Sequence, residues 1–180
     1  TKILREYITD QELYDKIIKR YETRKNNEKL FFMGITMQNH GGYTETYDNF
    51  PENYYKVGRS YTDANQYLSL VHESDEAVKN LISYFSKVDD PVEIIFFGDH
   101  QPSLNSNFYP ILNGKGLTGL TEDELEKLYT VPFFIWTNYD TPEETVDITS
   151  LDYLSTMALE RAGIELPAYN KSVSYTHLRA

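Results

Sequence analysis

The chain has 180 residues, of which 17 are basic and 28 are acidic, and its formal net charge is −11. This charge argues against nucleic-acid binding, which needs a cationic surface to neutralise phosphates, and it disfavours adhesion to an anionic membrane. The chain has no cysteine, which excludes disulfides, thiolate metal sites and a cysteine nucleophile within it. No apolar run approaches the roughly 20 residues of a membrane-spanning helix.

The two ends of the chain suggest how it is organised. It begins without an initiator Met, directly in sequence typical of a folded domain, and we expect it to be a piece of a longer protein. Residues 171–180 show no hydrophobic periodicity, and a non-native origin is one interpretation of this tail. We therefore expect one partial domain over residues 1–170, followed by the tail.

The first half of the chain predicts a helix, a strand and a loop. An apolar stripe predicts a helix over residues 9–25, where Thr9 and Glu12 have the spacing of a capping box. The short apolar run at residues 30–37 predicts a buried strand. Residues 38–58, rich in Gly, Asn and Pro, predict a loop.

The second half predicts further helices and strands in alternation. A long amphipathic pattern predicts a helix over residues 62–87. Apolar, β-branched and aromatic runs predict strands at residues 92–98 and 131–138. Shorter helices are expected over residues 121–129 and 149–162.

These elements together predict an α/β fold. A strand, a helix and a strand joined by so long a crossover should form a parallel pair between residues 30–37 and 92–98. The three predicted strands are apolar without alternation, which indicates that both faces are covered. The predicted architecture is a layered sheet with mainly parallel strands and helices on both faces.

Polar residues follow two of the predicted strands. His40 comes after the first, and Asp99 and His100 directly follow the second. Ligands bind beyond the carboxyl ends of parallel strands, so we expect the three side chains to converge. A carboxylate and a neutral imidazole are suitable metal ligands, which makes Asp99 and His100 candidates for a metal site. The alternative is that Asp99 caps a turn, His100 is a surface residue, and the Asn-His-Gly-Gly turn around His40 is purely structural.

Three segments, GITMQNHGGY, FFGDHQP and VPFFIWTNYD, resemble a known family in their order and spacing. They are similar to the extracellular catalytic domain of lipoteichoic acid synthases and related phosphoglycerol transferases. That family belongs to the sulfatase branch of the alkaline phosphatase superfamily. The resemblance extends to about Tyr169 and corresponds to the C-terminal half of the catalytic domain.

The resemblance implies roles for individual residues. Asp99 and His100 match the family's metal-binding pair, which usually holds Mn²⁺ or Mg²⁺, with Zn²⁺ as a further candidate. His40, with Asn39 beside it, matches the position that binds the substrate headgroup, and His40 would also act as a catalytic residue that assists the leaving group. The family's threonine nucleophile and its glutamate ligand match no segment of this chain.

The function implied is that of a metal-dependent phosphoglycerol transferase in the synthesis of cell-envelope polymers. Its partners would be a phospholipid headgroup like that of phosphatidylglycerol and a polymer or glycolipid acceptor. The domain would face the outside of a bacterial cell membrane, held there by upstream segments, and activity is expected of the full-length enzyme. A sulfatase or phosphodiesterase of the same superfamily, with water as the acceptor, is the second hypothesis. A non-catalytic α/β binding module is the third.

Overall fold

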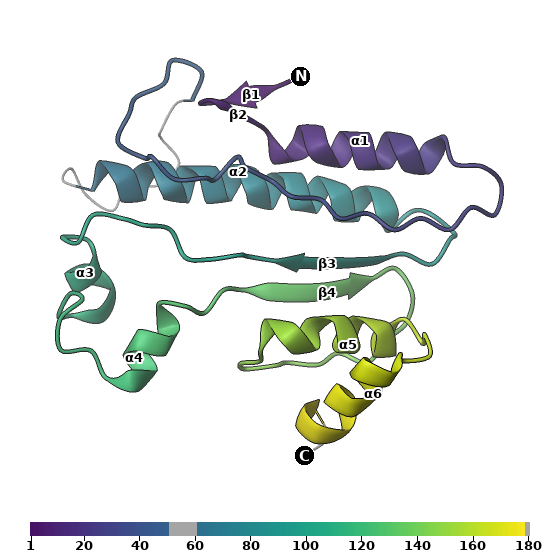
Figure 1. The fold of residues 1–180 in the computed structure, drawn as a ribbon. Helices are drawn as coiled ribbons and strands as arrows, with labels where there is room; N and C mark the ends of the chain where they lie inside the picture. Colours follow the sequence, from purple (N-terminus) through teal and green to yellow (C-terminus); the bar gives the residue numbers. More distant parts are fainter. Residues whose placement is uncertain (51–60, 179–180) are drawn as a thin grey trace. The chain divides into compact units, whose positions relative to one another are not determined.

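The computed structural model describes residues 1–50 and 61–178. The chain forms two compact units, whose elements are labelled in Figure 1. Unit 1 consists of residues 1–87 and 100–130, and unit 2 consists of residues 88–99 and 131–180. The predicted loop at residues 38–58 lies in unit 1, and its part from residue 51 onward falls outside the described residues.

Unit 1 is built from a hairpin and two long helices. The hairpin pairs β1 (Ile3–Leu4) with β2 (Tyr7–Ile8) in antiparallel register. Helix α1 (Asp10–Glu22) follows and contacts α2 (Thr62–Phe85), beside which it lies in Figure 1. The predicted helices over residues 9–25 and 62–87 are therefore confirmed.

Two short helices complete unit 1. They are α3 (Tyr109–Asn113) and α4 (Glu122–Lys127), the second of which confirms the helix predicted over residues 121–129. None of the helices in the described part of the chain is both long and apolar enough to cross a membrane.

The helix starts follow from local capping chemistry. The Thr9 hydroxyl accepts a hydrogen bond from the Glu12 N–H at 3.2 Å, which satisfies one unpaired donor of the first turn of α1. The Glu12 carboxylate accepts instead from the Lys2 N–H at 2.9 Å, so this capping box is only half formed. At α4 both halves are present between Thr121 and Glu124.

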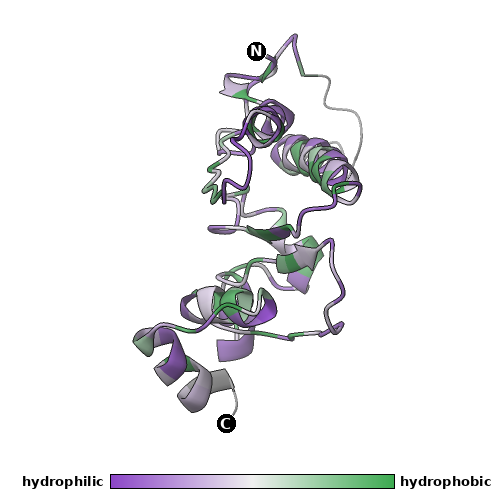
Figure 2. Cartoon of the chain, turned by 90° about the vertical axis from the view of Figure 1, so that its right-hand side faces the viewer, coloured by the Kyte–Doolittle hydropathy of each residue, from purple (hydrophilic) through white to green (hydrophobic). Residues whose placement is uncertain are grey.

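The core of unit 1 joins the hairpin to α2. Leu4, Tyr43, Phe50 and Leu70 are buried against one another. Figure 2 shows mixed polar and apolar residues along α2 and a mainly hydrophilic α1. Besides its apolar stripe, α1 is held by polar contacts of the buried Asp10, to Gln38 and to Ser74 of α2.

The predicted strand at residues 30–37 is wrong for the described structure. This segment pairs with no strand among the described residues. It passes over α1, where a Cβ atom added at Gly34 would lie 3.3 Å from Leu13 Cδ2. Phe31, Met33 and Ile35 are 87%, 68% and 74% exposed. A strand requires a neighbour that exchanges main-chain hydrogen bonds, and apolar composition alone does not supply one.

Unit 2 contains the other two predicted strands. β3 (Glu93–Phe97) and β4 (Phe133–Thr137) confirm the strands expected at residues 92–98 and 131–138. They pair in antiparallel register, from Glu93 opposite Thr137 to Phe97 opposite Phe133. The rings of Phe96 and Phe134 stack across the pair with centroids 5.3 Å apart.

The α/β content of the prediction is confirmed, but the mainly parallel sheet is not found. Both strand pairs in the described residues, β1–β2 and β3–β4, are antiparallel. The parallel prediction depended on a crossover from residues 30–37 to residues 92–98. The first of these segments is not a strand here, so it cannot form the predicted parallel pair with residues 92–98.

The C-terminal part of unit 2 is helical. Helix α5 (Leu151–Arg161) confirms the prediction over residues 149–162. Helix α6 (Ala168–Val173) begins before the expected tail and ends within it, and a π-helical turn (Ser174–Leu178) follows. The buried Ser174 hydroxyl donates to Glu160 Oε1 at 2.6 Å, so the beginning of the tail contacts α5. The non-native origin of residues 171–180 stays a prediction.

Gly98, at the end of β3, provides a test of packing in unit 2. A Cβ atom added there would lie 3.1 Å from Val131 Cβ, closer than normal contact. Gly98→Ala should therefore lower the free energy of unfolding by about 1–3 kcal/mol through overpacking. Thermal unfolding measures this effect, with Gly41→Ala as the control because no atom lies within 4 Å of a Cβ built at Gly41.

A second substitution tests the cause of that effect. Val131→Ala removes the two γ-carbons, which would lie 3.4 and 3.8 Å from the Cβ atom added at Gly98. It should therefore relieve part of the destabilisation in the double variant. If Gly98→Ala is as stable as the wild type, the close approach does not exist in solution.

Candidate functional site

The first candidate residues, Asn39 and His40, lie in a turn that we call the His40 turn, residues 38–42. It follows the extended apolar segment directly, and the His40 N–H donates to the Met37 carbonyl at 3.0 Å. The Tyr43 hydroxyl donates to the Asn39 carbonyl at 2.7 Å. Asn39 is half-buried, whereas His40 is exposed and accessible to a ligand.

A buried arginine in the β1–β2 hairpin holds this turn. Arg5 is only 4% exposed. Its Nη2 donates to the carbonyls of Gln38 at 3.0 Å and of His40 at 2.6 Å. Its Nη1 donates to Gln66 Oε1 at 3.0 Å and to the Gly42 carbonyl at 3.4 Å. One guanidinium therefore connects β1–β2, the His40 turn and α2.

The environment of Arg5 is specific to this side chain. Its guanidinium carbon lies 5.4–6.0 Å from the ring centroids of Tyr7, Tyr43 and Tyr47, within the range of cation–π attraction. Its φ is 53°, a left-handed conformation that costs an L-residue roughly 1–2 kcal/mol. Such strain persists only where the surrounding contacts hold the residue firmly.

The imidazole of His40 has its own partner in the same hairpin. The Tyr7 hydroxyl lies 3.2 Å from His40 Nδ1, and the two rings have centroids 5.7 Å apart. With Nδ1 engaged by Tyr7, Nε2 is the ring nitrogen left to contact a substrate. A partner on one nitrogen also limits which tautomer and ring orientation the histidine adopts.

A second buried network fixes the start of the His40 turn. Gln38 is 1% exposed, and its Oε1 accepts from the Asp10 N–H at 3.1 Å. Its Nε2 donates to Ser74 Oγ at 3.2 Å, and Asn39 Nδ2 donates to the same oxygen at 2.9 Å. The Ser74 hydroxyl in turn donates to Asp10 Oδ2 at 2.5 Å. The turn is thus bonded to α1 and to α2 at once.

Burial changes the acidity of this network. Desolvation raises the pKa of Asp10 above its ordinary value of 3.8, although hydrogen bonds from Ser74 and Thr36 favour the ionised form. One carboxylate oxygen, Oδ1, is buried and has no hydrogen-bond partner within residues 1–50 and 61–178, which is consistent with a disfavoured charge.

The other candidates, Asp99 and His100, directly follow β3, and both are exposed. His100 Nδ1 lies 2.9 Å from the Gln101 carbonyl oxygen. A carbonyl oxygen only accepts, so in this contact Nδ1 carries the proton and Nε2 presents a lone pair. An imidazole held in this way is typical of a metal ligand. The carboxylate of Asp99, the preceding residue in the sequence, is a suitable hard donor. Asp99 belongs to unit 2 and His100 to unit 1.

These two residues alone do not complete a metal shell. Within residues 1–50 and 61–178, no group of three or more His, Asp or Glu side chains is arranged to hold a metal ion. The donor chemistry of Asp99 and His100 fits a divalent cation that receives further ligands from elsewhere. His40 lies in unit 1 and Asp99 in unit 2, and their convergence stays a prediction.

The sequence did not predict the residues that support the His40 turn. Arg5, Tyr7 and Gln38 were not candidates, because each acts through partners distant along the chain. The hydrogen bond from Arg5 to Gln66 spans 61 residues, for example. A weak signal existed in Gln38, a polar residue at the end of a long apolar run.

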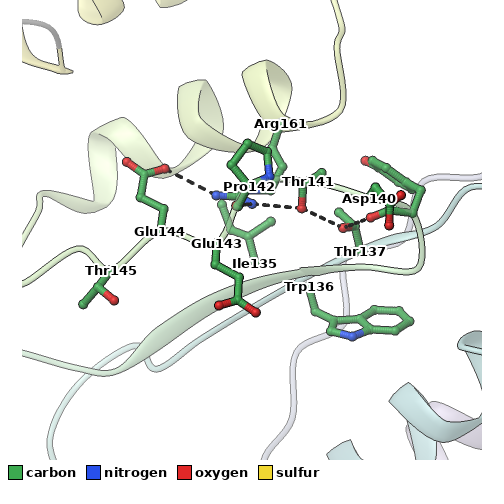
Figure 3. Close-up of a pocket in the computed structure, with 11 residues that line it drawn as sticks. Ile135, Trp136, Thr137, Asp140, Thr141, Pro142, Glu143, Glu144, Thr145 and Arg161 are labelled. Carbon is green, nitrogen blue, oxygen red and sulfur yellow. Dashed lines mark hydrogen bonds and ion pairs between the residues drawn. The ribbon is translucent and has the colours of Figure 1, made fainter.

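An open polar cavity of about 700 Å³ lies within unit 2 (Figure 3). Arg161 of α5 donates into the segment after β4, to Thr141 Oγ1 at 3.1 Å and to the Pro142 carbonyl at 2.9 Å, and it pairs with Glu144 at 3.4 Å. None of the four predicted site residues lines this cavity. Its arginine connects that segment to α5, and we assign it no catalytic role.

Comparison with known proteins identifies relatives of this chain. A sequence model of the Sulfatase family matches residues 2–164. A Rhizobium meliloti (strain 1021) protein named for cyclic beta-1,2-glucan modification is 27% identical over 96% of this chain and 28% of its own length. The capsular polysaccharide biosynthesis protein RkpI of the same organism is 33% identical over 56% of this chain and 17% of its own length.

A solved structure has the same fold. It is the Streptococcus pyogenes phosphoglycerol transferase GacH in complex with sn-glycerol-1-phosphate. The similarity covers 100% of this chain and 44% of that one, with a TM-score of 0.71 and 20% sequence identity. The chain thus spans less than half the length of each of these three proteins.

The buried Asp10 predicts a pH dependence of stability. Because its pKa is higher in the folded than in the unfolded state, the folded state binds more protons between the two values. The free energy of unfolding should then fall as pH rises from about 3.8, by up to about 1.4 kcal/mol per pH unit. Asp10→Asn should remove this part of the slope.

Urea unfolding at a series of pH values measures the slope. Asp15→Asn, an exposed position on the same helix, serves as the control and should keep the wild-type slope. Superimposable pH profiles for the wild type and Asp10→Asn would contradict the prediction.

Proposed function

The chain belongs to the sulfatase family, and on that premise we propose that it forms part of an enzyme that transfers phosphoglycerol to a glycan. The resemblance seen in the three sequence motifs is thereby confirmed. The observation that carries the proposal is the fold similarity, over the whole chain, to a phosphoglycerol transferase solved with sn-glycerol-1-phosphate. The two Rhizobium relatives are named for glucan modification and capsular polysaccharide biosynthesis, which supports a glycan as the acceptor.

His40 and Asn39 would bind the headgroup of the donor. The Tyr7 contact at Nδ1 leaves His40 Nε2 to hydrogen-bond a phosphate or glycerol oxygen. When the phosphorus–oxygen bond to the leaving alcohol breaks, a proton at Nε2 would pass to that alcohol oxygen. Asn39 lies next to it in a turn already fixed by buried hydrogen bonds, so little ordering is needed on binding.

Asp99 and His100 would hold a divalent cation, Mn²⁺ or Mg²⁺ first, with Zn²⁺ as a further candidate. His100 would bind through Nε2, since its Nδ1 donates to the Gln101 carbonyl. When bound, the cation would neutralise charge on the phosphodiester and favour the ionised form of a hydroxyl nucleophile. A chain of net charge −11 can hold an anionic headgroup in this way, because local charges outweigh the total.

The donor would be a phospholipid with a headgroup like that of phosphatidylglycerol, at the outer face of a bacterial cell membrane. Hydrolysis is the competing activity, favoured by the Sulfatase family match itself. A transferase and a hydrolase would differ in their products. Incubating the intact protein with phosphatidylglycerol vesicles and an oligosaccharide should give a phosphoglycerol-modified sugar, detected by mass spectrometry. Release of free glycerol phosphate or sulfate without a modified sugar would instead establish a hydrolase.

Removing the metal ligands tests the proposed chemistry. In the intact protein, Asp99→Ala and His100→Ala should each lose bound metal and lower turnover at least about 10²-fold, since even indirect ligand support contributes that much. Elemental analysis and the transfer assay measure the two effects. Asp89→Ala, an exposed acid shortly before the same strand, is the control and should retain both. Full turnover and metal content in Asp99→Ala would refute the assignment.

A further inference from the structure

We propose that Arg5 is the positioning residue for His40, and that it acts with Tyr7 from the β1–β2 hairpin. The inference rests on the proposed role of His40 in phosphoglycerol transfer. The hairpin would fix both the main chain and the ring of the reacting histidine. It lies outside the three segments that carry the family resemblance.

The first argument is where the contacts of Arg5 fall. Its guanidinium donates to the carbonyls of Gln38, His40 and Gly42, which are residues before, at and after the histidine. The contact to His40 itself, at 2.6 Å, is the shortest of the three. An arginine that only filled space would not need to bond three carbonyls of one turn. The arrangement fixes the backbone orientation from which the His40 side chain extends.

The second argument is that only a guanidinium makes this set of contacts. The four described acceptors are three main-chain carbonyls and the side-chain oxygen of Gln66. A planar fork with five N–H donors reaches acceptors in several directions, whereas a lysine ammonium is a compact charge on a flexible stem. Arg5→Lys therefore keeps the charge and much of the length but cannot hold the whole turn.

The third argument concerns the energetic disadvantages that accompany Arg5. Among the residues that the structure describes, its cation is buried against uncharged acceptors and its Nε has no hydrogen-bond partner, and its backbone is left-handed. Each of these features opposes folding. An apolar side chain would avoid burying a cation, but it would leave the carbonyls of the His40 turn without these donors. The arginine is therefore matched to the orientation of the His40 turn.

Tyr7 contacts the imidazole ring of His40 itself. It is the first residue of β2, two residues after Arg5 in the turn of the hairpin, and its hydroxyl lies 3.2 Å from His40 Nδ1. Arg5 thus fixes the main chain of His40, while Tyr7 fixes the ring. A single rigid hairpin sets both, which leaves Nε2 in a defined position.

A double-mutant cycle in the intact protein tests the proposal. Arg5→Lys should lower kcat about 10²-fold, the effect of a displacement of roughly 1 Å at a reacting group, and leave KM nearly unchanged. Tyr7→Phe, which removes one hydroxyl, should lower kcat in the same direction by a smaller factor. In the His40→Ala background neither substitution should lower kcat further, within a factor of about 2. Tyr84→Phe is the matched control, because it also removes one hydrogen bond, to Glu22, in the same unit.

The outcomes separate the possible failures. If His40→Ala keeps full turnover, the proposed function of this turn fails and the positioning role fails with it. If His40→Ala lowers turnover while Arg5→Lys and Tyr7→Phe do not, only the positioning role is overturned. Equal losses in both backgrounds would show a merely structural role and also overturn it. Should Arg5→Lys fail to fold, Tyr7→Phe decides the question by the same cycle.

Discussion

The structure of unit 1 depends on one buried cation. Arg5 lies in a two-residue turn between short strands, which alone would be marginally stable in water. Its guanidinium connects this hairpin to the His40 turn and to Gln66 of α2, and its tyrosine neighbours cover it. The hydrophobic cluster around Leu4 and Leu70 lies in the same region. The apolar cluster buries side chains away from water, and the guanidinium orients the His40 turn.

The sequence predicted those elements whose signals are local. The helices follow from hydrophobic periodicity and capping residues. The strands β3 and β4 follow from short apolar runs, and the two strands pair with each other. The segment at residues 30–37 has an equally apolar pattern but pairs with no described strand. Whether an apolar run becomes a strand depends on a neighbour elsewhere in the fold, which local composition does not encode. The error in predicting parallel strands follows from the same cause.

The residues of the candidate site also differ in whether a local sequence signal identifies them. His40, Asp99 and His100 were found because short motifs place them after apolar runs. Arg5 and Gln38 were missed because their significance lies in contacts 28 to 61 residues away. Arg5 carries no local signal that it will be buried, and the signal at Gln38, a polar residue at the end of an apolar run, is weak. Candidate reacting groups can therefore be proposed from motifs, while the residues that contact and orient them are visible only in the fold.

The two parts of the proposed site are held in position by different contacts. The His40 turn is held by hydrogen bonds within unit 1, from Arg5, Tyr7 and the Asp10–Ser74 network. His100 is exposed and contacts the neighbouring Gln101 carbonyl, and the cation that it binds would help to set its position. Arg5 also places a positive charge beside the His40 carbonyl in a chain that is acidic overall. Because a buried charge is poorly screened by solvent, this guanidinium would contribute to holding the proposed phosphate ligand at the turn.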